Sequence, residues 1–134
     1  MRVVVDTNVF VSSFFGGNPK KVIDHWRSGE ITLCLSREIV DEYVEVMERL
    51  RLPKNLISEV LTLFASGFNL IFAGKTRPLD IVSADSDDNK LFECAIALNA
   101  RFIVSGDKAV VEVRDYMGIK VESPRQFLTR FSEA

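Results

Sequence analysis

The chain has 134 residues, of which 47% are hydrophobic and 27% charged, and its formal net charge is −2. This composition excludes a disordered chain, and no apolar run approaches the ~18 residues that a membrane-spanning helix needs. We expect one globular domain over residues 1–134, no membrane association, and a cytoplasmic location, because the start MRVVVD is too short and too soon charged for a secretory signal.

Short apolar runs alternate with helical patterns along the first half of the chain. The β-branched run RVVV predicts a fully buried strand, and Asn18-Pro19 and Ser36 are typical helix starts. In chain order we expect a strand at 2–5, a helix at 19–28, a strand at 31–35, a helix from Ser36 to about Leu50, a helix at about 54–66 and a strand at 68–72.

The second half continues the same alternation after a polar loop. Here we expect a helix at about 88–99, a strand at 101–105, a short helix after Asp107, a strand at IKVE and a final helix from Ser123-Pro124, with Gln126 completing a capping box. Strands alternating with helices predict a three-layer α/β/α sandwich with a mainly parallel central sheet. In such sheets ligands bind beyond the carboxyl ends of the strands.

Two cysteines and one histidine argue against a zinc site. Cys34 and Cys94 lie in apolar stretches, no CxxC spacing is present, and His25 is the only histidine. We expect both thiols to be buried and reduced.

Two aspartates each follow a predicted strand. Asp6 comes directly after RVVV, and Asp107 comes after RFIVS and one glycine. Because parallel strands end at the same edge of a sheet, these two acids from opposite halves of the chain should meet there. A turn or helix-cap role remains an alternative for each of them.

A third acid is predicted from the helix SREIVDEYVEVMERL. With a step of about 100° per residue, its apolar residues form one stripe and four of its five acids point away from that stripe. Glu42 is the acid nearest to the buried stripe.

The fourth acid is Asp88, in the first turn of the helix within SADSDDNKLFECAIAL, where it points along the apolar stripe. Asp85 and Asp87 point less directly inward. An aspartate at this position also caps free N–H groups, and the sequence does not separate cap from catalyst.

Four neighbouring carboxylates repel one another unless a cation lies between them. Oxygen ligands without histidine or cysteine suit Mg²⁺ or Mn²⁺ better than zinc, and such acidic clusters commonly serve phosphoryl chemistry.

Four sequence blocks, DTNVF, S-x-E-x-V-x-E, DxDDNK-x-F-E-x-A and VSGDK, together resemble the PIN domain, and more narrowly its single-domain group regarded as toxins of toxin–antitoxin pairs. The resemblance spans Asp6 to about Val121. It implies an α/β/α fold and Mg²⁺- or Mn²⁺-dependent cleavage of single-stranded RNA, with an antitoxin protein and a homodimer as candidate partners.

The family's acidic quartet maps onto Asp6, Glu42, Asp88 and Asp107, both as catalytic residues and as metal ligands. The resemblance also implies supporting roles. Asn8 matches an asparagine that braces the first aspartate, Ser105 a hydroxyl beside the last acid, and Asn89 a residue that follows the third acid. Ala109 stands where relatives sometimes have one more acid, which weakens a second metal position.

An RNA backbone needs cations to guide it. The candidates near the expected edge are Lys20, Lys21, Arg37, Lys90 and Lys108, with Arg49, Arg51 and Lys54 as further cations around a helix break. Phe14 and Phe15 could stack on bases or pack against a partner, but we expect them to pack in the core.

Two other functions compete with the nuclease. A phosphatase of the haloacid-dehalogenase type needs an acid two residues after the first aspartate, where this chain has Asn8, so it ranks far lower. A catalytically silent PIN-like module that binds RNA or protein predicts gaps in the acidic set, whereas all four acids are present.

Overall fold

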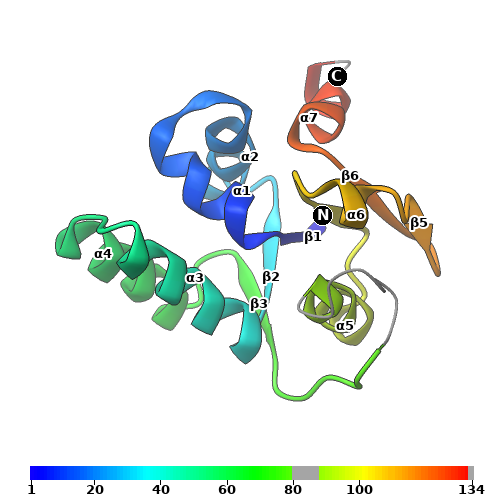
Figure 1. The fold of residues 1–134 in the computed structure, drawn as a ribbon, viewed down its shortest axis with the longest axis horizontal. Helices are drawn as coiled ribbons and strands as arrows, with labels where there is room; N and C mark the ends of the chain where they lie inside the picture. Colours follow the sequence, from blue (N-terminus) through cyan, green and yellow to red (C-terminus); the bar gives the residue numbers. More distant parts are fainter. Residues whose placement is uncertain (80–87, 133–134) are drawn as a thin grey trace.

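The centre of the fold is a mainly parallel β-sheet, seen in a computed structural model whose described residues are 1–79 and 88–132 (Figure 1). Within these residues, six strands lie in the order β3-β2-β1-β4-β6-β5. All neighbours are parallel except β5 and β6. The strands are β1 (Arg2–Val5), β2 (Thr32–Ser36), β3 (Leu70–Ala73), β4 (Phe102–Val104), β5 (Asp115–Tyr116) and β6 (Ile119–Glu122).

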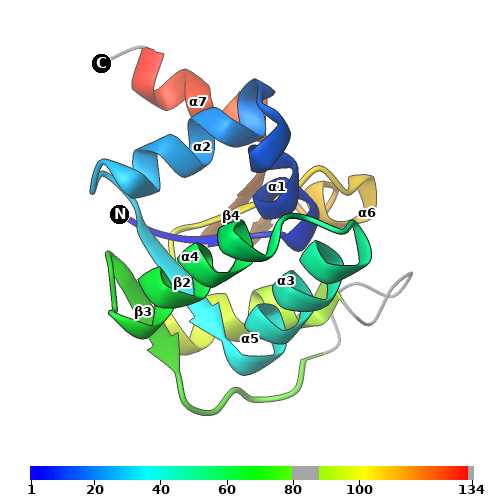
Figure 2. The same ribbon diagram turned by 90° about the vertical axis from the view of Figure 1, so that its left-hand side faces the viewer.

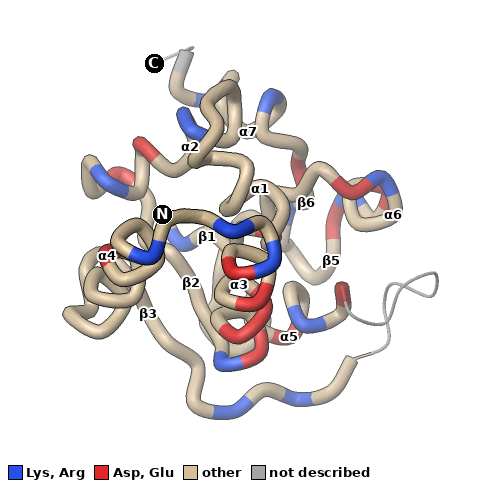
Figure 3. The backbone as a smooth tube through the Cα atoms, turned by 60° about the vertical axis from the view of Figure 1, so that its left-hand side comes forward, with Lys and Arg blue, Asp and Glu red and all other residues tan. Residues whose placement is uncertain are grey.

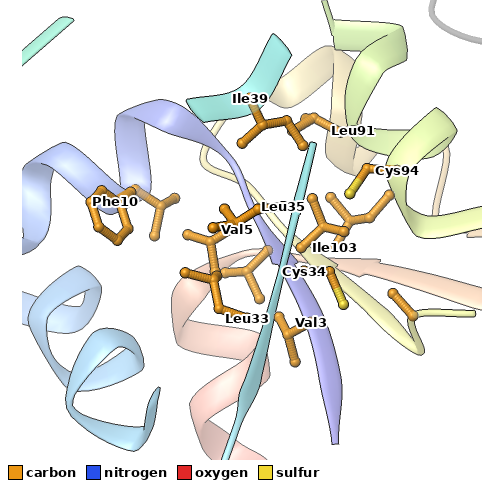
Figure 4. Close-up of a cluster of buried hydrophobic side chains, with 14 of the residues drawn as sticks. Val3, Val5, Phe10, Leu33, Cys34, Leu35, Ile39, Leu91, Cys94 and Ile103 are labelled. Carbon is orange, nitrogen blue, oxygen red and sulfur yellow. The ribbon is translucent and has the colours of Figure 1, made fainter. Parts of the chain in front are cut away.

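Helices cover both faces of this sheet (Figures 1 and 2). The helix α5 packs against β1, β2, β3 and β4. Its residues Leu91 and Cys94 lie on one side of the strands, and Phe10 of α1 lies on the other (Figure 4). The helices are α1 (Thr7–Ser12), the 3₁₀ turn η1 (Ser13–Phe15), α2 (Gly17–Arg27), α3 (Arg37–Arg49), α4 (Lys54–Ala65), α5 (Asn89–Leu98), α6 (Lys108–Val111) and α7 (Pro124–Ser132). The predicted α/β/α architecture is confirmed.

The central strands are apolar on both faces because helices cover both. Val3, Val4 and Val5 of β1 are each at most 1% exposed. A parallel sheet buried in this way needs no alternation of polar and apolar residues. The strand order reverses between β1 and β4, so the ends of these two strands form the switch point at which α/β sheets bind ligands.

An aromatic cluster fixes the helix that follows β1. The ring of Phe10 stacks on that of Tyr43 with centroids 4.3 Å apart, and it also contacts Trp26 and Phe64. The buried Tyr43 hydroxyl donates a hydrogen bond to the carbonyl of Val5, the last residue of β1. These contacts hold α1 and α3 against the end of β1, where Asp6 follows.

Most predicted elements are present, with small shifts at their ends. Ser36 caps α3 by accepting a hydrogen bond from the amide of Ile39, and Ser123 and Gln126 form the expected capping box. Both cysteines are buried and free, as expected. The helix α1, the turn η1 and the two-residue β5 were not predicted.

No helix among residues 1–79 and 88–132 is long and apolar enough to cross a membrane.

Candidate functional site

Asp6 lies at the switch point of the sheet, between the last residue of β1 and the first turn of α1. Its amide donates a hydrogen bond to the carbonyl of Val104 at the end of β4, at 2.9 Å. The residue is only 5% exposed. Burial raises the pKa of the Asp6 carboxyl, and the negative charges of Glu42 and Asp107 raise it further, while the hydrogen bond from Ser105 acts in the opposite direction.

Ser105 joins the two aspartates that follow β1 and β4. Its fully buried hydroxyl donates to Oδ2 of Asp6 at 2.5 Å and accepts from the amide of Asp107 at 3.0 Å. Oδ1 of Asp107 caps α6 by accepting from the amide of Ala109 at 2.9 Å. Asp107 is therefore a helix cap, as the alternative reading allowed, and it is also an electrostatic neighbour of Asp6.

Glu42 is the acid of α3 that points toward the protein. Its side chain is 30% exposed, whereas the other acids of α3 lie on the exposed face. Oε1 accepts a hydrogen bond from the Thr7 hydroxyl, and Oε2 lies 2.6 Å from the Nζ atom of Lys90. The helical periodicity thus identified the one inward acid of this helix, whose buried residues are Ile39, Tyr43, Val46 and Met47.

Asp88 is the residue before α5, and its Oδ2 atom is buried. Within the described ranges, its side chain makes no capping hydrogen bond to α5, so the cap alternative is not seen here. Asn89 is buried in the first turn of α5. The expectations for Asp85 and Asp87 lie outside the described residues.

The structure thus brings Asp6, Glu42 and Asp107 to one end of the sheet, and α5, which Asp88 precedes, packs against α3 there. Figure 3 shows acidic segments along α3 beside the start of α5. In the part of the chain that the structure describes, no three acidic, histidine or cysteine side chains form a ready-made metal-binding group. Both oxygens of Glu42 are instead engaged by Thr7 and Lys90.

The donor chemistry fits a hard divalent cation. Asp6 places a carboxylate in a buried position beside two further negative charges, and this repulsion is one cause of its raised pKa. A cation bound there would relieve the repulsion, and carboxylate oxygens are the ligands that Mg²⁺ and Mn²⁺ prefer. The four acids Asp6, Glu42, Asp88 and Asp107 therefore remain the predicted ligands, and Glu42 has Thr7 and Lys90 as its present partners.

Of the supporting residues, Ser105 contacts the acids directly. Asn8 lies exposed on α1, and among the described side chains the hydrogen bond to the Asp6 carboxylate comes from Ser105. The bracing role of Asn8 stays a prediction.

The five candidate RNA-binding cations differ in their surroundings. Lys108 begins α6 beside Asp107 and is 91% exposed, and Arg37 begins α3 with an exposed side chain. Lys20 forms an exposed ion pair with Asp24 on α2. Lys21 lines a hollow of about 540 Å³ between α2 and α7, which none of the four predicted acids lines. Lys90 alone among the five has a mostly buried side chain.

The expected core packing holds for Phe14 and is wrong for Phe15. The ring of Phe14 packs edge-on against Phe10. Phe15 is 71% exposed, because the turn η1 ends there and Gly16 takes the chain away at a positive φ.

Sequence reasoning missed two residues of the site. Thr7 binds Glu42, and the hydroxyl in the DTN block was the available signal. Tyr43 supports the end of β1 from within α3, and its position next to Glu42 was the only hint in the sequence.

The chain is similar to a described protein family and to a protein of known sequence. A family profile described as PIN domain matches residues 2–109. A protein of Methanocaldococcus jannaschii, described as uncharacterized protein MJ1680, is 32% identical over an alignment of 148 positions, which covers 99% of this chain and 93% of that protein.

Proposed function

Because the chain belongs to the PIN-domain family, whose members are generally nucleases, we propose that it is a Mg²⁺- or Mn²⁺-dependent endoribonuclease of single-stranded RNA. The observation that carries this proposal is the buried Asp6 carboxylate at the sheet's switch point, held by Ser105 beside the charges of Glu42 and Asp107. An acidic, partly dry site of this kind concentrates a divalent cation, which is what phosphodiester hydrolysis without a side-chain nucleophile requires.

The residues of the chain divide this work between them. Asp6, Glu42, Asp88 and Asp107 would hold the cation through their carboxylate oxygens. When bound, the cation supplies an activated water and a positive charge for the phosphate in the transition state. Ser105 keeps Oδ2 of Asp6 in place and ties it to the backbone of Asp107, so that two ligands from different strands keep a fixed separation. Lys108 is exposed beside Asp107 and would bind the RNA backbone through its positive charge.

Purified protein and end-labelled single-stranded RNA test this function. We expect cleavage in Mn²⁺ or Mg²⁺, none in EDTA, and loss of at least a hundredfold in rate for Asp6→Asn. Asp41→Asn is the matched control, since Asp41 is an exposed acid on α3 and its ion pair with Arg37 is long, at 3.9 Å. Cleavage that survives Asp6→Asn would belong to a contaminant and would end the assignment. Duplex RNA and single-stranded DNA, run beside the RNA, define the substrate class.

A silent PIN-like module that binds RNA or protein is the second candidate. One observation favours it: among the described residues Glu42 faces Lys90 and Thr7 and no ready-made metal group is formed. RNA binding without cleavage at any Mn²⁺ concentration in the same assay would select this alternative.

We further propose that the nuclease is the toxin of a toxin–antitoxin pair, on the resemblance of its sequence blocks to that group. Induced expression should arrest growth, and Asp6→Asn should abolish the arrest. Co-expression with the product of a small adjacent reading frame should rescue growth and yield a complex on gel filtration. The same column shows whether the chain alone is a homodimer.

A further inference from the structure

The ion pair between Lys90 and Glu42 connects the candidate site to α5. Nζ of Lys90 lies 2.6 Å from Oε2 of Glu42, and the two side chains are 16% and 30% exposed. The residues are 48 positions apart in the sequence, so the pair forms only when α3 packs against α5.

This pair differs from the ion pairs at the surface of the same helices. Arg37–Asp41 and Arg49–Glu45 on α3 are each 3.9 Å apart, and all four of these side chains are at least 65% exposed. Such pairs contribute little, because water and salt screen them. A short and mostly buried ion pair is screened much less, so the charge of Lys90 attracts the Glu42 carboxylate more strongly than the surface pairs attract each other.

The position of the ammonium group matters as much as its distance. Glu42 is an electrostatic neighbour of Asp6, and its second oxygen already accepts from Thr7. Lys90 therefore places a positive charge beside the carboxylate that a divalent cation would need.

We propose that Lys90 is an internal counter-ion that holds Glu42 while the site has no divalent cation, and that cation binding displaces it. The inference rests on the proposed function, since it assumes that Glu42 becomes a ligand. Lys90 is then a positioning residue that sets the cation concentration at which the site fills, rather than a surface contact for RNA.

Two opposite effects of removing this charge follow. Without a cation, Lys90→Met leaves a partly buried Glu42 carboxylate beside Asp6 with no counter-charge, which destabilises the fold. With a cation, the variant no longer has an ion pair to break or a positive charge to repel. We expect Mn²⁺ to bind about tenfold more tightly, which corresponds to about 1.4 kcal/mol.

Mn²⁺ binding to the purified full chain, without RNA, tests the proposal. Electron paramagnetic resonance counts free Mn²⁺ and gives a Kd for the wild type, for Lys90→Met and for Lys90→Arg, which keeps the charge. Lys90→Gln is the second neutral variant, used if Lys90→Met does not fold. Lys120→Met is the matched control. Lys120 is exposed, and its neighbour across the sheet, Phe102, lies at the end of β4 that is opposite to Ser105.

The proposal expects a tighter Kd for the neutral variants only, and a larger rise of their melting temperature on adding Mn²⁺. If the wild type binds Mn²⁺ and the neutral variants bind it equally or more weakly, Lys90 is a structural ion pair or a ligand-orienting group and the inference is wrong. If the wild type binds no Mn²⁺ while it cleaves no RNA, the proposed function fails and the inference fails with it.

Discussion

The hydroxyl of Ser105 donates to the carboxylate of Asp6 at 2.5 Å, although the two residues are 99 positions apart in the sequence. This bond joins the ends of β1 and β4, the adjacent parallel strands between which the strand order reverses. The same hydroxyl accepts from the amide of Asp107, so one buried side chain sets the geometry between two predicted ligands.

Ser105→Ala should weaken Mn²⁺ binding by about 10- to 100-fold, the usual effect of removing a hydrogen bond to a metal ligand. The change removes one oxygen from a fully buried position, so the fold should persist. Titration calorimetry with Mn²⁺ measures the effect, and Ser66→Ala, at an exposed serine after α4, is the control. Unchanged affinity would mean that Ser105 does not position Asp6.

Asp6→Asn should stabilise the ion-free protein while it removes activity. Asp6 has a pKa raised mainly by burial, so its ionised form opposes folding above that pKa. The neutral amide avoids this cost, and we expect a gain of about 1 kcal/mol in the free energy of unfolding. Urea titrations at pH 7 in EDTA measure it. A loss of stability would show that the ionised carboxylate is a net stabilising group.

The pH dependence of this gain has a defined sign. The raised pKa means that the folded state holds the Asp6 proton more tightly than the unfolded state does. The contribution of Asp6 to stability is therefore full below the unfolded pKa, near 3.8, and is lost as the pH rises through the higher folded pKa. The advantage of Asp6→Asn should grow with pH over this window and then level off, and an advantage that shrinks with pH would contradict the account.

Tyr43→Phe should destabilise the protein by about 1–3 kcal/mol, because it leaves the Val5 carbonyl without its buried donor. The stack on Phe10 is kept, so the core should not collapse. Thermal melts measure the loss. If the hydroxyl also positions Asp6 through Val5, the Mn²⁺ Kd should rise a few-fold. An unchanged Kd would mean that Tyr43 contributes to the stability of the fold and does not position Asp6.

The sequence predicted what depends on local patterns. The apolar run of β1 predicted a strand, and the acids that follow β1 and β4 were predicted to meet at one edge of the sheet. Helical periodicity identified Glu42 as the inward acid of α3. The helix α1 was not predicted because TNVFVS is short and rich in β-branched residues. Tyr43 and the aromatic cluster around Phe10 stabilise this helix in the fold.

Contacts between distant segments could not be predicted in this way. Lys90 was predicted as a cation for the RNA backbone, because the sequence does not show that α3 packs beside α5 and brings Glu42 to it. The hydrogen bond from Thr7 to Glu42 likewise depends on how α1 meets α3. Such pairings decide whether an acid is available to a cation, and only the folded chain defines them.

The most direct test of the central claim is the anomalous diffraction of Mn²⁺ in crystals of the full chain. The account predicts a peak about 2.1 Å from carboxylate oxygens of Asp6 and of at least one of Glu42, Asp88 and Asp107, with the Glu42–Lys90 ion pair opened if Glu42 is a ligand. An Mn²⁺ ion bound elsewhere, or none at Asp6 in protein that cleaves RNA, would contradict it.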